Sequence, residues 1–424
     1  MTPARSWDDP RKMVGVDEVR ARIVSMVEPL AAVAMPLLEA RGLVLAEDVV
    51  APNDVPPFRN SAMDGFAIRA SDTSSSTTTT FELIGTIPAG SSRQGRLEAG
   101  QAARIMTGAP MPEGADAVVR FEEVNSARAG TITIERPVEP GENVRLAGED
   151  MRSGDMVLRR GRRIETSEIG MLAALNYSVV RVHRRPRIGI LSTGDEVIDL
   201  GPELEPGQIR DANAYALAAR VAQLGADPVQ LGIAADRRDA LQERLRAAQD
   251  CELIVTSGGV STGDFDLVKE VLRREGQVDI LSVRMKPGKP LALGEVGGVP
   301  LLGLPGNPVA AIVAFDQFAR PALLRMLGHQ ELLPPTVTAR LTAAVNNRGR
   351  RRHFERGMLT LRDGVWFVAP TGIHGSAMLT SLVAANCYAV IDEDCEQAPE
   401  GSEVTVQILD ASAVLRQLGT SPTN

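Results

Sequence analysis

The sequence predicts a multidomain α/β protein built around a doubly wound parallel sheet. Between residues 185 and 330, apolar runs that end in polar loops, such as RIGILSTGDE and CELIVTSGG, alternate with amphipathic stretches such as NAYALAARVAQLGA. Strands that alternate with helices indicate a parallel sheet with helices on both faces. The chain has 424 residues, enough for about three domains of ordinary size. We therefore expect an α/β domain over residues 185–330 and further domains on either side of it.

The sequence pattern of the N-terminal part changes from helical spacing to short strand-like runs and back. Helical spacing occurs in VDEVRARIVSMV and MPLLEARGLVLAEDV, and again in TSEIGMLAALNY, which Thr166 or Ser167 could cap. Short alternating runs broken by Gly and Pro lie between these segments. If the later helix packs back on the first one, the strand-rich part is an insertion. We expect a helical domain of residues 14–52 and 149–184, and an inserted β-rich domain of residues 53–148.

The C-terminal part returns to strands. Runs such as HFERGMLTL, VWFVAP, CYAVID and EVTVQIL are short and evenly spaced. This spacing is typical of a small β-barrel or sandwich. We expect such a domain over residues 331–411.

Composition and charge exclude several classes of function. Lys and Arg total 46 against 54 Asp and Glu, and the net charge of −8 argues against a general nucleic-acid binder. No run approaches eighteen apolar residues and no signal peptide is readable, so we expect a cytoplasmic protein with no membrane span. The three cysteines make no CxxC pair and the four histidines are scattered, which favours a hard ion held by oxygen ligands over zinc or iron–sulfur sites.

A glycine-rich loop, TSGGVSTGDFD, follows the strand CELIV. Glycines let the backbone approach an anion, and the helix that follows turns its free N–H groups toward the same place. The loop thus predicts an anion or phosphoester site, with a tight strand-to-helix turn as the alternative. Neither GxxxxGK[ST] nor GxGxxG occurs, so ordinary ATPase and dinucleotide sites lack sequence support.

Acidic residues follow three strands of the same sheet. Asp195 and Glu196 follow RIGIL, Asp236 follows QLGIA, and Asp264 and Asp266 follow CELIV. The carboxyl ends of parallel strands share one edge of a sheet. Several carboxylates converging there repel one another unless a cation joins them, which suggests Mg²⁺ bridging a phosphate. For Asp264, helix capping is the alternative.

Two lysines follow in the segment RMKPGKPLALG. Lys286 and Lys289 are separated by Pro-Gly, a stiff turn that would hold both ammonium groups near one place. Such a pair suits an oxyanion or a phosphate, and a solvated surface pair is the alternative. The segment GLPGNP then leads into a helix that we expect to start at Pro308, because proline is well tolerated in a first helical turn.

Seven motifs in order carry a family resemblance: NSAMDGFA, RIMTGAPMPEGADAVV, GEDM, STGDE, SGGVSTGDFD, KPGKP and GLPGNPV. This combination resembles the molybdopterin molybdenumtransferases, the MoeA and gephyrin E-domain family, from about Val16 to Leu409. The resemblance implies a cytoplasmic homodimer with an elongated helical domain for dimerisation, a β-rich insertion, a molybdopterin-binding α/β domain and a C-terminal β-barrel. It further implies Mg²⁺-dependent insertion of molybdate, as co-substrate, into adenylylated molybdopterin, with release of AMP and formation of active molybdenum cofactor. A molybdopterin adenylyltransferase would supply the substrate.

The resemblance also implies roles for individual residues. Asp266 would act in adenylate hydrolysis, with Glu196 and Asp236 supporting the metal ion or water. Contacts to the pterin phosphate would come from Ser257, Gly258, Gly259, Ser261 and Thr107. Molybdate would be bound by Lys286, Lys289, Arg356 and Ser376.

Some assignments have open alternatives. Asp64, which the resemblance makes a catalytic residue, and Thr107 would line the cleft from the partner subunit, or else they support hairpin turns, and Asp150 of GEDM has the same two readings. Arg352 could share or replace the role of Arg356. Phe66 stands where the family usually has Tyr. An enzyme that adenylylates molybdopterin and a scaffold protein on the same fold are the rival functions, and the sequence does not separate molybdate from tungstate.

Overall fold

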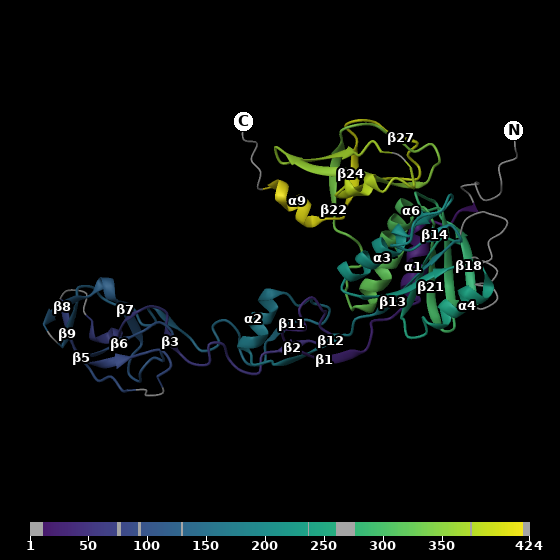
Figure 1. Cartoon of the computed structure of the whole chain (residues 1–424). Helices are drawn as coiled ribbons and strands as arrows, with labels where there is room; N and C mark the ends of the chain where they lie inside the picture. Colours follow the sequence, from purple (N-terminus) through teal and green to yellow (C-terminus); the bar gives the residue numbers. More distant parts are fainter. Residues whose placement is uncertain are drawn as a thin grey trace. The chain divides into compact units, whose positions relative to one another are not determined.

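The computed structural model describes residues 12–73, 78–91, 95–128, 130–235, 237–259, 276–373 and 375–418. The chain divides into two compact units (Figure 1). The first unit contains residues 1–33, 42–46 and 181–424, and the second contains residues 34–41 and 47–180. The boundaries expected for four domains remain predictions.

A six-stranded sheet forms the centre of the first unit. β13 pairs in parallel with β16 and β17, and β17 pairs in parallel with β21. β20 and β18 extend the sheet with antiparallel pairs. The order is β16 (Asp227–Ala234), β13 (Arg187–Thr193), β17 (Leu253–Ser257), β21 (Val299–Leu304), β20 (Pro290–Val296) and β18 (Gly276–Ser282). The predicted parallel sheet is confirmed, with an antiparallel edge added.

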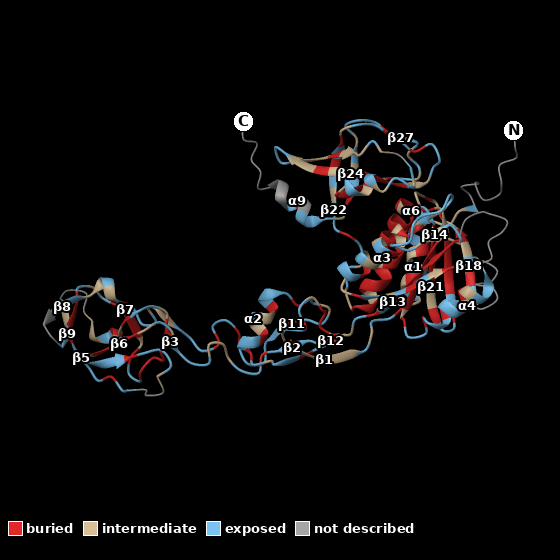
Figure 2. Ribbon diagram, in the orientation of Figure 1, coloured by how far each residue is buried: buried red, intermediate tan, exposed pale blue. Residues whose placement is uncertain are grey.

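Helices cover both faces of this sheet. Alternate strand residues such as Ile190 and Leu191 belong to different apolar clusters, because successive side chains of a strand point to opposite faces. One cluster contains residues of α1 (Val16–Ser25), α3 (Ala212–Gln223), α6 (Pro308–Ala314), the π-helical turn η5 (Phe315–Ala319) and α7 (Arg320–Met326). The other contains residues of α4 (Arg238–Arg246). Figure 2 shows buried residues concentrated in this sheet and in the helices around α6.

The C-terminal strands close into a barrel. The ring runs β24 (Arg352–Arg362), β25 (Val365–Pro370), β22 (Thr336–Leu341), β28 (Glu403–Ile408), β26 (Cys387–Ile391) and back to β24. The short strand β19 (Met285–Lys286), from the loop beyond β18, adds to β24 in parallel. Beside the ring lie β23 (Val345–Asn346), paired with β27 (Gln397–Ala398), and the helices α8 (Thr380–Val383) and α9 (Ala411–Leu418). Of the two predicted forms, barrel and sandwich, the barrel is the one observed.

The second unit contains the predicted β-rich segment. Its six-stranded sheet has the order β7 (Ala117–Arg120), β4 (Gly65–Ile68), β6 (Gln101–Ile105), β5 (Thr79–Ile87), β9 (Thr131–Ile134) and β8 (Asn125–Arg128). Short pairs add β3 (Asn60–Ser61) with β10 (Val144–Arg145) and β2 (Val49–Val50) with β11 (Met156–Leu158). The turns η3 (Ala70–Asp72) and η4 (Phe121–Glu123) connect strands, and α2 (Thr166–Ala174) lies beyond the sheet in sequence.

The helix predicted over MPLLEARGLVLAEDV is wrong. This segment contains the end of β1 (Ala32–Pro36), which pairs with β12 (Val179–His183), then a turn and β2. Gly42 has a φ of 82°, a left-handed conformation that interrupts a helix. Leu43, Val44 and Leu45 are buried in succession, so the apolar spacing came from a buried run and not from one face of a helix.

One further expectation about helices is corrected, and another stays a prediction. α1 packs in the core of the first unit, where Val16, Val19 and Ile23 join the cluster that contains η5, whereas α2 belongs to the second unit, so its expected packing against α1 stays a prediction. The N-cap of α2 is Glu165, and neither Thr166 nor Ser167 caps it. A capping box explains this start: the Glu165 side chain accepts from the backbone of Glu168, whose carboxylate accepts from the Glu165 N–H at 3.0 Å.

Among the helices of the described ranges, none has the length and apolar character needed to cross a membrane.

Candidate active site

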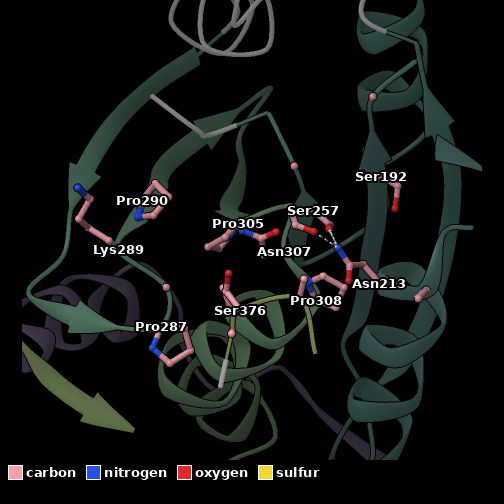
Figure 3. Close-up of a pocket in the computed structure, with 18 of the residues that line it drawn as sticks. Ser192, Asn213, Ser257, Pro287, Lys289, Pro290, Pro305, Asn307, Pro308 and Ser376 are labelled. Atoms are coloured by element: carbon pink, nitrogen blue, oxygen red, sulfur yellow. Dashed lines mark hydrogen bonds between the residues drawn. The ribbon is translucent and has the colours of Figure 1, made fainter. Parts of the chain in front are cut away.

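A cavity of about 1080 Å³ lies at the carboxyl ends of β13, β17 and β21. The strand register pairs Ser192 with Ser257 and Ser257 with Leu304, so these three strands end at the same edge. The cavity is also lined by the loop at 286–290, by β24 of the barrel and by residues 375–377 (Figure 3). All of these residues belong to the first unit.

The first described residues of the glycine loop line the cavity. Ser257 ends β17 and is buried, and Gly258 and Gly259 follow with φ angles of 92° and 68°. A Cβ on Gly258 would lie 2.9 Å from both the carbonyl oxygen and Oγ1 of Thr193. Position 258 therefore requires glycine, both for its backbone conformation and because a side chain would not fit. The missing side chain lets the backbone at Gly258 lie close to Thr193 at the edge of the sheet.

An asparagine in the first turn of α3 joins three cavity segments. Nδ2 of Asn213 donates to Oγ of Ser257 at 2.6 Å and to the carbonyl oxygen of Gly306 at 2.8 Å (Figure 3). Asp211 caps the helix by accepting from the backbone of Ala214 at 3.0 Å. Sequence reasoning missed Asn213. Its signal was a polar amide two positions after a capping aspartate, in the first turn of an apolar helix.

Cationic side chains line the barrel side of the cavity. Lys286, Lys289, Arg356 and Ser376, the four predicted molybdate ligands, all line it. Burial lowers the pKa of the Lys286 ammonium, Glu355 opposes this, and Arg351 and Arg356 lower the pKa further. A bound anion would relieve the repulsion among these cations, so the arrangement suits an oxyanion.

Arg352 and Arg356 have different surroundings. Arg356 is 4% exposed, lines the cavity, and donates to Oγ of Ser381 at 3.2 Å and to the carbonyl oxygen of Ile373 at 3.0 Å. The guanidinium of Arg352 instead pairs with Asp17 at 2.8 Å and with Glu393 at 3.0 Å. Arg352 is thus balanced by two carboxylates and does not line the cavity.

A buried histidine–glutamate pair also lines the cavity. His353 and Glu355 are 3% and 1% exposed, and Nε2 of His353 lies 2.9 Å from Oε2 of Glu355. Burial lowers the pKa of His353 and Glu355 counteracts the shift. Sequence reasoning missed this pair, because nothing in the letters HFERG indicates which side chains face inward.

The predicted acidic cluster is only partly within the described residues. Glu196 lines the cavity. Within the described ranges, no group of three or more His, Cys, Asp or Glu side chains is arranged to hold a metal ion. Asp236, Ser261, Asp264 and Asp266 lie outside the described residues, as does the helix expected after the glycine loop.

The residues predicted from the β-rich part lie in the second unit. The N–H and Oγ1 of Thr107 donate to Oδ1 of Asp64 at 2.7 and 2.8 Å, and these hydrogen bonds lower the pKa of Asp64. Asp150 lines a smaller hollow of about 450 Å³ with Arg145 and Glu149. The residues that line the larger cavity all belong to the first unit.

Comparisons with known proteins find matches along most of the chain. Family models described as the MoeA N-terminal region (domain I and II), a probable molybdopterin binding domain and the MoeA C-terminal region (domain IV) match residues 14–176, 189–325 and 338–409. The chain is 35% identical over 399 residues to the molybdopterin molybdenumtransferase of Haemophilus influenzae, covering 93% of this chain and 98% of that one. It is 40% identical over 365 residues to the enzyme of that name from Nostoc sp., covering 84% of each.

A solved structure agrees with this match. The molybdopterin biosynthesis MoeA protein from Pyrococcus horikoshii has a TM-score of 0.82 and 33% sequence identity, covering 94% of this chain and 100% of that one. Fold and sequence together define a multidomain α/β enzyme of molybdenum cofactor biosynthesis. The chain belongs to the molybdopterin molybdenumtransferase (MoeA) family.

Proposed function

We propose that the enzyme inserts molybdate into adenylylated molybdopterin in a Mg²⁺-dependent reaction that releases AMP and gives the active molybdenum cofactor. The single observation that carries the proposal is one cavity that joins a glycine loop to a cationic wall. The glycine loop suits a phosphate, and the cations suit a small dianion. A reaction that brings an adenylylated pterin to an oxyanion needs both in one place.

The phosphate end of the pterin would bind at the edge of the sheet. Ser257 offers a hydroxyl and Gly258 and Gly259 offer backbone close to the cavity. Asn213 fixes this loop against the segment at Gly306. Ser261 and Thr107 complete the proposed set of phosphate contacts.

Molybdate would bind at the cationic wall. Lys286, Lys289 and Arg356 supply positive charge and Ser376 supplies a hydroxyl. Charge-assisted hydrogen bonds to a dianion are stronger than neutral ones, so no protein ligand to the metal atom is required. Tungstate has nearly the same size and charge, and the proposal extends to it as a competing oxyanion.

Mg²⁺ would be held at the acidic side of the cavity. The residues present fit this ion in the chemistry of their donors, since Mg²⁺ takes one or two carboxylates together with substrate phosphate and water. Glu196 lines the cavity, and we propose Asp236 and Asp266 as its companions. When bound, the ion would offset negative charge on the phosphoanhydride, and Asp266 would act in its hydrolysis.

The proposal includes a partner subunit and a donor enzyme. In a homodimer, Asp64 and Thr107 would reach the cavity of the other subunit, and the hydrogen bonds between them already hold the Asp64 carboxylate in one orientation. Asp150 is proposed with them. A molybdopterin adenylyltransferase would deliver the substrate, in the cytoplasm.

The test is AMP release from purified enzyme with adenylylated molybdopterin and Mg²⁺, with and without micromolar molybdate. We expect molybdate-dependent release with molybdenum retained on the pterin, and Asp266→Asn should slow release while pterin binding survives. Bound pterin without any AMP release would overturn the transferase reaction and favour a scaffold protein. Unchanged turnover in Asp266→Asn would remove that residue from the mechanism.

A further inference from the structure

The buried pair His353 and Glu355 lies in the wall of the cavity beside the proposed oxyanion site. The two residues are two positions apart on β24, so their side chains point to the same face of the strand. Lys286 stands opposite His353 in the ladder between β19 and β24. The pair therefore borders the group of cations proposed to bind molybdate.

One ring nitrogen of His353 has no hydrogen-bond partner among the residues that the structure describes. Nε2 lies 2.9 Å from Oε2 of Glu355, and when Glu355 is ionised its carboxylate accepts a proton donated by Nε2–H. Within the described ranges Nδ1 is buried without a hydrogen-bond partner. Burying a polar nitrogen unpaired is costly, so a partner from the cavity would stabilise the site.

Whether Nδ1 of His353 carries a proton depends on the ligand that contacts it. With the proton on Nε2, the neutral imidazole presents a lone pair at Nδ1, whereas the imidazolium presents a second N–H donor. A fully ionised oxyanion offers only acceptor oxygens. An oxyanion next to His353 therefore favours the protonated ring.

Burial and two neighbouring cations lower the pKa of His353 in the unliganded protein. Burial lowers the pKa of His353 most, Lys286 and Arg356 lower it further, and Glu355 raises it. β26 places the apolar Ile391 opposite His353. A dianion between the cations would offset their effect on the ring and shift the pKa of His353 upward.

We propose that His353 takes up a proton when an oxyanion binds, so that the His353–Glu355 pair is a proton-coupled part of the oxyanion site. This inference rests on the proposed function, because the ligand is the molybdate assigned to Lys286, Lys289 and Arg356. Glu355 positions the ring and stabilises its charged form. Molybdate is then bound together with a proton donor within reach of its oxygens.

The experiment is calorimetric titration of the purified full-length protein with sodium molybdate alone. Runs at one pH in a sulfonate buffer and in an amine buffer, which differ in ionisation enthalpy, give the number of protons taken up on binding. We expect an uptake approaching one proton per molybdate near neutral pH. Affinity should fall by up to about tenfold per pH unit as the pH rises between the unliganded and liganded pKa values of His353.

Variants of single residues show which side chain takes up the proton. His353→Gln keeps an N–H donor toward Glu355 but cannot be protonated, so it should fold, lose the proton uptake and bind molybdate with little pH dependence. Glu355→Gln should move the uptake to lower pH, because the carboxylate that favours the imidazolium is gone. His329 does not line the cavity, so His329→Gln should keep the uptake.

The outcomes separate this inference from the proposed function. Molybdate binding without proton uptake in the unaltered protein, or equal uptake in His353→Gln, overturns the inference and leaves the molybdate site in place. No molybdate binding at any pH overturns both together. AMP release measured on the same preparations tests the transferase reaction independently of the proton.

Discussion

Replacing Gly258 by alanine should damage the site in two separable ways. The φ of 92° at position 258 is one that L side chains rarely adopt, which costs about 1–2 kcal/mol. The new methyl group would also lie 2.9 Å from two oxygen atoms of Thr193, and such overpacking costs about 1–3 kcal/mol more. We expect the free energy of unfolding to fall by about 2–5 kcal/mol in total.

Gly207 provides a matched control. Its φ is 91°, and a Cβ there would have open space within 4 Å. Gly207→Ala thus carries the backbone cost alone, and the difference between the two variants isolates the close approach of Gly258 to Thr193.

The assay is urea denaturation of both variants, followed by AMP release at varied concentrations of adenylylated molybdopterin. Gly258→Ala should be the less stable variant and should raise the KM for the pterin substrate, whereas Gly207→Ala should leave the KM unchanged. Equal stability losses in the two variants, with the same KM, would refute the close-packed loop as the phosphate site.

Three further predictions concern other parts of the first unit. Asn213→Ala removes two hydrogen bonds of about 1 kcal/mol each, so urea denaturation should show that the free energy of unfolding falls by about 2 kcal/mol. The control Asn53→Ala, at an exposed position, should leave the free energy of unfolding almost unchanged. Arg356→Ala should raise the KM for molybdate by about 10- to 100-fold in the AMP-release assay, whereas Arg352→Ala should lower stability and keep that KM. Burial raises the pKa of Asp316, so its contribution to stability is fully present below pH 3.8 and is lost as the pH rises through the raised pKa. Over that pH range, the urea midpoint of the unaltered protein should fall relative to that of Asp316→Asn. A difference between the two midpoints that does not change with pH would contradict the raised pKa of Asp316.

Sequence patterns predicted the strands and helices that have strong local signals. The barrel strands begin and end close to the apolar runs that predicted them, and α6 starts at Pro308 as expected. The failure at Met35 to Val49 has a local cause, because a buried run of three apolar residues imitates helical spacing and Gly42 interrupts the helix. Glu165 was missed as a cap because a glutamate occupies the N-cap position, where a capping box usually has serine or threonine.

The site could be predicted where family motifs or strand ends marked it. Glu196, Ser257 and Lys286 lie where parallel strands and the KPGKP turn bring them. Asn213 and His353 were missed for different reasons. The partners of Asn213 lie 44 and 93 positions away in sequence, and the importance of His353 comes from its burial inside the barrel wall.

The sequence by itself determined the family, the alternation of strands and helices, and the residue types that a phosphate and an oxyanion require. Periodicity and turn chemistry are local, so they can be read along the chain. Only the tertiary structure decided which arginine lines the cavity, since Arg352 and Arg356 are both arginines of one strand and differ by the partners that packing gives them. It likewise decided that a histidine and a glutamate share a buried wall beside Lys286, because burial and charge depend on every element that surrounds a group.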